Sequence, residues 1–90
     1  MSTSILQIKI MPKQEADLKQ LKEDIESSLK KVGAIKIEKI EEQEIAFGLR
    51  ALIVTFAWPE EKETSEAEEA LKKIETISSL DIIDYRRAFG

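Results

Sequence analysis

With 90 residues the chain is long enough for one domain, so residues 1–90 are expected to form a single domain with one core and one modest functional surface. Its formal net charge of −4 argues against unassisted nucleic-acid binding, because such binding gains its affinity largely from neutralised phosphates. The absence of cysteine and histidine excludes disulfides, thiol catalysis, thiolate or imidazole metal sites and the commonest general base.

The first part of the chain predicts a strand over residues 4–11 followed by an amphipathic helix. The strand alternates apolar and polar residues, with its core face formed by Leu6, Ile8 and Ile10. Pro12 ends the strand, because proline has no N–H for the ladder. Asp17 is the expected N-cap of the helix, with Gln20 as its capping-box partner, and Gly33 is the expected C-cap. The helix carries apolar residues at spacings of three and four, namely Leu18, Leu21, Ile25, Leu29 and Val32.

The second part of the chain predicts three strands and a second helix. Alternation slips near Lys39, so an irregularity is expected in the strand marked by Ile35, Ile37 and Ile40. The denser, β-branched strand over residues 49–58 is predicted to be central, and Pro59 stops it. Ser65 and Glu68 predict the capping box of a helix lined by Ala67, Ala70, Leu71 and Ile74. The last strand contains Leu80, Ile82, Ile83 and Tyr85.

This βαββαβ order predicts an α+β fold of the ferredoxin-like type. In that fold a four-stranded antiparallel sheet with strand order 4-1-3-2 carries two helices on one face. Right-handed crossovers then place the turn over residues 42–48 at one end of the sheet and residues 86–90 at the opposite end. A strand of ~9 residues at ~3.3 Å each separates the two segments by about 30 Å, so they cannot form one active site.

An aromatic residue and a glycine, Phe47 and Gly48, stand just before the long apolar strand, in the segment Ile-Ala-Phe-Gly-Leu-Arg-Ala-Leu over residues 45–52. In one interpretation Phe47 packs over the end of the sheet while Gly48 supplies an unusual dihedral. In the other, Phe47 is an exposed aromatic anchor of the kind that dominates small interfaces.

A basic pair, Arg86 and Arg87, ends the last strand. The pair has two interpretations as well. The arginines are either solvated charges that pair with Asp84 or Asp81 for less than ~1 kcal/mol, or groups that contact a partner.

Residues 45–52 together with the ending Tyr85-Arg86-Arg87 resemble the nucleotide-exchange domain of elongation factor 1-beta in its short archaeal form. The resemblance covers nearly the whole chain. It implies a guanine-nucleotide exchange factor that acts on the GTPase elongation factor 1-alpha, which delivers aminoacyl-tRNA to the ribosome. Such a factor makes and breaks no bond, so it is not an enzyme. Without cysteines for disulfides and with no N-terminal apolar run like a signal or membrane span, the chain is expected to be cytoplasmic and to have no membrane contact. No direct contact with nucleic acid is expected because of the net charge, and no cofactor or metal is expected.

The resemblance also implies roles for four residues, Phe47, Gly48, Arg86 and Arg87, as the contacts with the GTPase. In the family, the end of the sheet that carries Phe47 contacts the second domain of the GTPase, where the aminoacyl end of tRNA also binds. A basic residue near the C-terminus enters the magnesium site of the GTPase, and aligning the last strand places Arg87 at that position. Eukaryotic members have lysine there, whereas this chain has arginine followed by three further residues.

Two other functions fit the same order of elements. An RNA-recognition module has this topology, and Ala46-Phe47-Gly48 is similar to its third-strand motif, but the strand over residues 4–11 lacks a stacking aromatic. A small acylphosphatase-like hydrolase would need a glycine-rich anion loop with an arginine, which residues 10–13 do not supply.

The acidic clusters and the single tryptophan have structural interpretations. The clusters lack EF-hand spacing and a central glycine, so they are interpreted as solvated loops rather than calcium sites; they are Glu41, Glu42 and Glu44, and Glu60, Glu61 and Glu63. Trp58 is interpreted as a packing residue beside Pro59.

Overall fold

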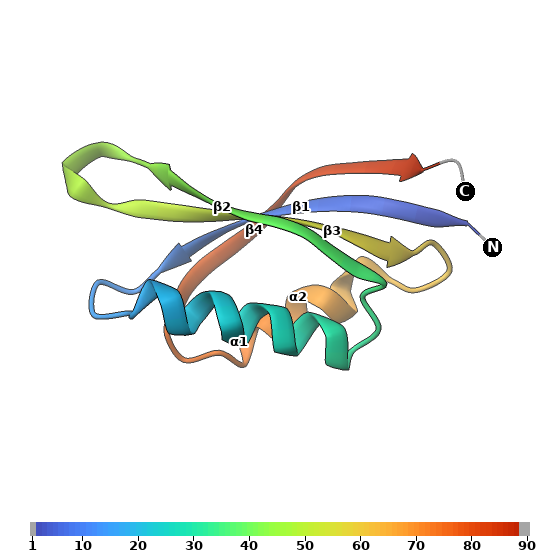
Figure 1. Ribbon diagram of the computed structural model, residues 1–90, viewed down its shortest axis with the longest axis horizontal. Helices are drawn as coiled ribbons and strands as arrows, with labels where there is room; N and C mark the ends of the chain where they lie inside the picture. Colours follow the sequence, from blue (N-terminus) through green and yellow to red (C-terminus); the bar gives the residue numbers. More distant parts are fainter. Residues whose placement is uncertain (1, 89–90) are drawn as a thin grey trace.

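The computed structural model, which describes residues 2–88, has the predicted βαββαβ order with a short 3-10 turn between the second and third strands (Figure 1). The bounds are β1 Thr3–Pro12, α1 Leu18–Lys31, β2 Lys36–Glu44, η1 Ala46–Gly48, β3 Arg50–Pro59, α2 Thr64–Lys72 and β4 Ile77–Ala88. The strands form one antiparallel sheet in the order β2-β3-β1-β4, which places β3 and β1 in its centre. The predicted ferredoxin-like fold and its strand order are confirmed.

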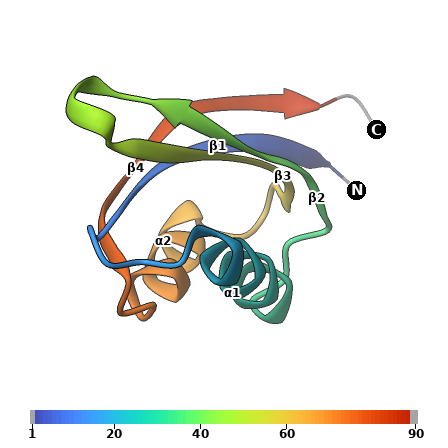
Figure 2. The ribbon, with the colours of Figure 1, turned by 60° about the vertical axis from the view of Figure 1, so that its left-hand side comes forward.

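Both helices cover one face of the sheet and leave the other face open (Figure 2). The core lies between these layers, and its sheet side is built from alternate residues of the two central strands: Leu6, Ile8, Ile10, Leu52, Val54, Phe56 and Trp58. The helices contribute Leu21, Ile25, Leu29, Ala67 and Leu71. Neither helix among residues 2–88 is long and apolar enough to cross a bilayer.

Trp58 closes one end of the core, as predicted. It is fully buried, and its ring meets Phe56 edge-on, with centroids 5.9 Å apart and an interplanar angle of 88°. The indole N–H donates to the Lys62 carbonyl at 3.3 Å, while the Lys62 ammonium lies 5.7 Å from the ring centroid. These contacts tie the loop after β3 to the core.

The ends of α1 follow the predicted capping residues with one correction. Asp17 accepts hydrogen bonds from the backbone N–H groups of Lys19 and Gln20, so it is the N-cap. The Gln20 side chain donates to Asp24 at 3.0 Å, one turn further on, and is not seen to close the predicted capping box. Gly33, with φ of 113°, ends the helix after Val32 in a Schellman arrangement, as its N–H donates to the Lys30 carbonyl.

The predicted start of α2 is wrong. The helix begins at Thr64 with Glu63 as N-cap, so Ser65 lies inside it and the Ser65–Glu68 capping box does not form. The Glu66 N–H donates to the Glu63 carbonyl at 3.2 Å, so the first turn of the helix already closes onto Glu63, two residues before Ser65. Ser65 instead donates its hydroxyl to the Glu63 carboxylate at 3.4 Å. Ile74, predicted to line the helix, lies beyond its last residue and packs against the core from there.

Among residues 2–88, three register shifts interrupt the strand pairing, and one of them lies between Met11 and Pro12 at the end of the β1–β4 pair. The register of β2 against β3 shifts between Ile37 and Lys39, as predicted from the broken alternation. A second shift lies between β1 and β4, where Asp84 and Ile82 oppose successive residues of β1 and leave Ile83 as the extra residue. The predicted turn over residues 42–48 is too long, because β2 continues to Glu44 through pairing with Arg50.

Candidate functional site

The β2–β3 hairpin extends past the helices and carries one candidate surface at its tip, residues 45–49 (Figure 1). The Ile45 N–H donates to the Leu49 carbonyl at 2.7 Å, and the Leu49 N–H to the Ala46 carbonyl at 3.4 Å. The tight turn between these bonds places two residues in the left-handed region, Phe47 with φ of 65° and Gly48 with φ of 75°. A Cβ at Gly48 would meet nothing within 4 Å, so the backbone dihedral and not lack of space favours glycine there.

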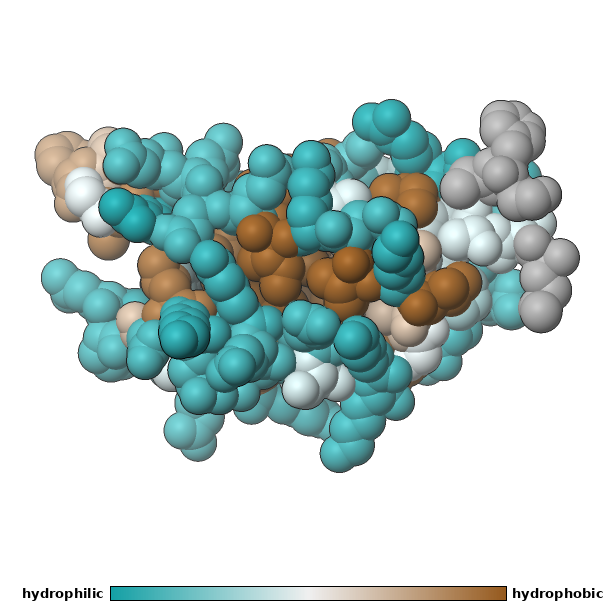
Figure 3. Space-filling view, viewed as in Figure 1, coloured by the Kyte–Doolittle hydropathy of each residue, from teal (hydrophilic) through white to brown (hydrophobic). Residues whose placement is uncertain are grey.

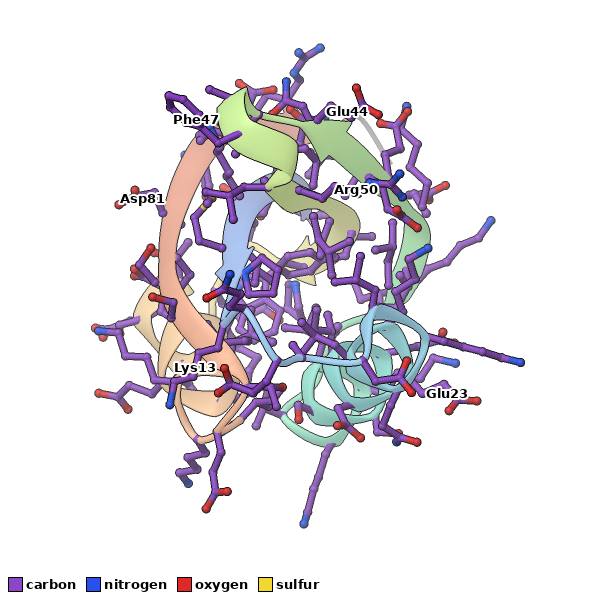
Figure 4. The ribbon with its side chains drawn as sticks, turned by 90° about the vertical axis from the view of Figure 1, so that its left-hand side faces the viewer. Lys13, Glu23, Glu44, Phe47, Arg50 and Asp81 are labelled. Atoms are coloured by element: carbon purple, nitrogen blue, oxygen red, sulfur yellow. The ribbon has the colours of Figure 1, made fainter. Side chains whose placement is uncertain are left out.

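Phe47 is 97% exposed and projects away from the body of the molecule (Figure 4). The hairpin tip forms a small apolar projection at the end of the space-filling view (Figure 3). A left-handed conformation costs a non-glycine residue roughly 1–2 kcal/mol, and an exposed ring gains no burial in return. Packing over the sheet end is therefore ruled out as the role of Phe47. Its predicted exposure is confirmed, while its contact with a partner stays a prediction.

A shallow hollow of about 230 Å³ adjoins the hairpin tip, between it and the loop after β1. Met11, Pro12, Lys13 and Gln14 line one side, and residues 47–50 line the other. The loop is held in place because the Lys13 N–H donates to the Thr76 carbonyl at 2.7 Å. The surface around Phe47 thus includes a segment that is far from it in the sequence and that sequence reasoning did not select.

The base of the hairpin is tied to α1 by a group of charges, the Glu42 cluster, which consists of Glu42, Lys22 and Arg50. The Glu42 carboxylate accepts hydrogen bonds from the Lys22 ammonium and the Arg50 guanidinium, each at 2.8 Å. The hydrogen bond from Lys22, followed by that from Arg50, holds the pKa of Glu42 below its ordinary value. Arg50 also lies 3.9 Å from Glu44, and both side chains stand beside the hairpin ribbon in Figure 4.

The acidic clusters seen in the sequence are dispersed among cations. Glu42 and Glu44 share Arg50, and Glu60 pairs with Arg87. Across residues 2–88 no three acidic side chains converge in the manner of a metal site.

The second candidate surface lies where β4 ends, and its two arginines pair with different partners. Arg86 pairs with Asp84 at 2.9 Å, as the solvated interpretation predicted. Arg87 pairs with Glu60 of the β3–α2 loop at 3.2 Å, a partner that sequence reasoning missed because only the fold brings the two together. Both arginine side chains are about three-quarters exposed, at 74% and 75%, so either can exchange its partner for another anion. Residues 89 and 90 of the predicted terminal segment lie outside the described residues.

The two candidate surfaces lie at opposite ends of the sheet, as predicted (Figure 1). The molecule has a long axis of 42 Å, and the 10 residues of β3 connect the two ends over roughly 30 Å. Phe47 and Gly48 therefore belong to one candidate surface, and Arg86 and Arg87 belong to a separate one at the opposite end of the sheet.

Comparison with known proteins identifies relatives over nearly the full chain. Residues 5–87 match the family described as "EF-1 guanine nucleotide exchange domain". A protein named elongation factor 1-beta from Methanosphaera stadtmanae is 43% identical over 82 residues, which cover 89% of this chain and 90% of that protein. The protein of the same name from Methanothermobacter thermautotrophicus is 36% identical, and the match covers 97% of this chain and 98% of that protein. The one from Methanosarcina barkeri is 43% identical, and the match covers 89% of this chain and 91% of that protein.

Proposed function

The chain belongs to the elongation factor 1-beta family through its guanine nucleotide exchange domain, and we propose that the two ends of its sheet act on different parts of the partner GTPase. Members of this family are exchange factors and not catalytic enzymes, and this protein is a guanine nucleotide exchange factor for elongation factor 1-alpha. It promotes release of GDP so that GTP can rebind. Its action is a linkage, in which a bound factor weakens nucleotide binding and bound nucleotide weakens factor binding to the same degree.

The hairpin tip anchors the exchange factor to the GTPase. Phe47 inserts into an apolar pocket on the second domain of the GTPase, and Gly48 allows the turn that presents it. The observation that carries this assignment is the 97% exposure of a ring held in a left-handed conformation. Aromatic side chains of this kind are enriched among the residues that dominate binding energy.

The other end of the sheet, which carries Arg86 and Arg87, promotes release of the nucleotide from the GTPase. Magnesium and the nucleotide phosphates hold the switch loops of a GTPase, so a group that displaces the metal weakens nucleotide binding efficiently. Arg86 and Arg87 supply permanent positive charge at this end, and a guanidinium can form two parallel hydrogen bonds with a carboxylate. The anions uncovered by departing magnesium are suitable partners for Arg87, whose benefit then appears mainly in the nucleotide-free state.

The test is the release rate of a fluorescent GDP analogue from purified elongation factor 1-alpha, with and without this protein. The proposal predicts faster release at micromolar concentrations, slower release with Phe47→Ala through weaker binding, and slower release with Arg87→Ala at saturating factor. Wild-type behaviour of both variants would remove the division of roles between the two ends.

Three further assignments belong to the same proposal. Residues 1–90 form one exchange domain, the protein works in the cytoplasm, where translation takes place, and it does not bind nucleic acid directly. The last is supported by the open face of the sheet, where β1 and β3 present aliphatic and polar residues, among them Ile5, Gln7, Lys9, Ile53 and Thr55. An RNA-recognition sheet stacks bases on aromatic rings at this place. Retention of homopolymer RNA in a filter-binding assay would contradict the assignment.

A further inference from the structure

The core-facing side of β2 begins with apolar residues and continues with a charged one. Its first inward residues, Ile37 and Ile40, pair with Phe56 and Val54 of β3 and pack against the core. The next inward residue is Glu42, opposite the fully buried Leu52. The apolar contacts of β2 thus end at Ile40, and the strand continues to Glu44 as part of a hairpin that projects beyond the helices (Figure 1).

Glu42 connects the projecting hairpin to the helix layer. It receives Lys22 from α1 and Arg50 from β3, so one carboxylate links three elements. The Glu42 and Lys22 side chains are two-thirds covered, with exposures of 32% and 34%. By contrast, the ion pair between Glu26 and Lys30 joins two residues within α1.

Phe47 depends on this connection for its direction. The ring is 97% exposed, so its position follows that of the hairpin. Glu42 stands five residues before Phe47, at most roughly 16 Å at the strand rise because the last residues form the η1 turn, so a bend of about 10° at Glu42 would move the ring by up to roughly 3 Å. A displacement of this size is enough to misplace an anchor in its pocket.

We propose that Glu42 is a positioning residue for Phe47, which it aims at the GTPase by tying the hairpin, which also holds the Glu42 carboxylate through Arg50 of β3, to Lys22 of α1. The inference rests on the anchoring role proposed for Phe47. A hairpin held in the bound direction loses less conformational freedom on association, so the contribution of Glu42 appears as affinity although its own carboxylate contacts no partner.

The experiment is a double-mutant cycle on binding of the full chain to elongation factor 1-alpha, measured by calorimetry for wild type, Glu42→Gln, Phe47→Ala and the double variant. Glu42→Gln is expected to weaken binding about two- to fivefold, the size of effect expected of an ion pair that is still in contact with solvent. In the Phe47→Ala background the same substitution should change nothing, because there is no ring left to aim. Lys22→Gln should reproduce Glu42→Gln, and Lys22→Arg should retain wild-type affinity.

Glu26→Gln and Lys30→Gln are the matched controls, because they remove the same charges from an exposed ion pair of the same helix. Both should bind as wild type does. Hydrogen exchange at the Ile45 amide, which donates to Leu49 at the hairpin tip, should be faster in Glu42→Gln than in Glu26→Gln.

The outcomes separate the inference from the proposed function. Additive effects in the cycle, or equal losses from Glu26→Gln, would show that Glu42 acts through charge alone and would overturn the inference. Weaker binding of Phe47→Ala with unchanged binding of Glu42→Gln would overturn the inference and leave the anchor standing. Unchanged binding of Phe47→Ala would remove both.

Discussion

Arg86 and Arg87 are neighbours in the sequence, but their side chains lie on opposite faces of the sheet. Arg87 pairs in register with the buried Ser4 and reaches Glu60 on the helix side, whereas Arg86 pairs with Ile5 on the open side. Residues directly opposite on adjacent strands share a face, so the alternation of β4 fixes this separation. A partner that engages one guanidinium from one face of the sheet does not engage the other in the same way.

The first prediction separates the two arginines. Arg87→Ala should slow catalysed GDP release more than it weakens binding to the GTPase, and Arg87→Lys should keep part of the activity because it keeps the charge. Lowering free magnesium with a chelator should reduce the difference between wild type and Arg87→Ala, since the step assisted by the arginine has then already occurred. A defect in Arg86→Ala alone would move the role to the open face. No defect in either variant would leave both as solvated charges.

The pairing of Arg87 with Glu60 leads to a second prediction. Arg87 must leave Glu60 before it can meet an anion of the GTPase, so Glu60→Gln should speed GDP release at subsaturating factor. The gain should not exceed about fivefold, because the Arg87 end of the pair is 75% exposed and a pair that reaches solvent in this way contributes less than ~1 kcal/mol. Glu61→Gln is the control, as it removes the same charge one residue along the loop. Equal gains from both variants would point to overall charge and not to release of Arg87.

A third prediction concerns the conformation of Phe47. Phe47→Ala should leave the free energy of unfolding within ~0.5 kcal/mol of wild type, because the ring is 97% exposed, yet it should weaken binding to the GTPase by ~2 kcal/mol or more. Wild-type Phe47 would occupy the surface of the GTPase that aminoacyl-tRNA also uses, so the exchange factor and aminoacyl-tRNA should compete for elongation factor 1-alpha. Phe47→Gly should lose binding equally while relieving the left-handed strain. Calorimetry and urea unfolding of the same samples measure both quantities.

The fourth prediction compares two apolar core residues, Leu21 and Ile74, that differ in how deeply they are buried. Leu21 is 1% exposed, so Leu21→Ala should cost about 2–5 kcal/mol of unfolding free energy. Ile74 is only partly buried beyond the end of α2, so Ile74→Ala should cost less. The midpoints of denaturant unfolding show which of the two substitutions costs more stability. Equal losses would mean that the segment after α2 is packed as tightly as α1.

The fifth prediction is a pH dependence at the hairpin base. The pKa of Glu42 is lowered in the folded protein by the hydrogen bonds from Lys22 and Arg50, so its stabilising contribution is complete above the ordinary carboxyl pKa of about 4.3. That contribution is lost as the pH falls through the lowered pKa. The difference in unfolding free energy between wild type and Glu42→Gln should therefore be small but measurable at pH 7 and should shrink below about pH 4. Glu44, which also faces Arg50, is present in both proteins, so its contribution largely cancels in the difference. A difference that stays constant with pH would show that Glu42 stabilises by packing alone.

Much of the fold was predictable from the sequence because local patterns carried it. The alternation of Leu6, Ile8 and Ile10 reappears as the buried face of β1, and the broken alternation at Lys39 reappears as a register shift. Element boundaries were less predictable, since capping depends on the turn that precedes a helix. The Ser65–Glu68 pattern met the sequence rule, but the turn at Glu63 had already started α2.

The sequence by itself determined the order of elements, the separation of the Phe47 and Arg87 ends and the family resemblance, because these follow from periodicity, chain direction and short motifs. Only the tertiary structure decided that Phe47 stands exposed in a left-handed turn and that Arg87, not Arg86, faces the helix side of the sheet. It also paired Lys22 with Glu42 and Glu60 with Arg87, residues 20 and 27 positions apart in the chain. Such pairs are set by the crossing of a helix over a sheet and by the meeting of two strand ends, and exposed charges leave no periodic signal from which either could be inferred.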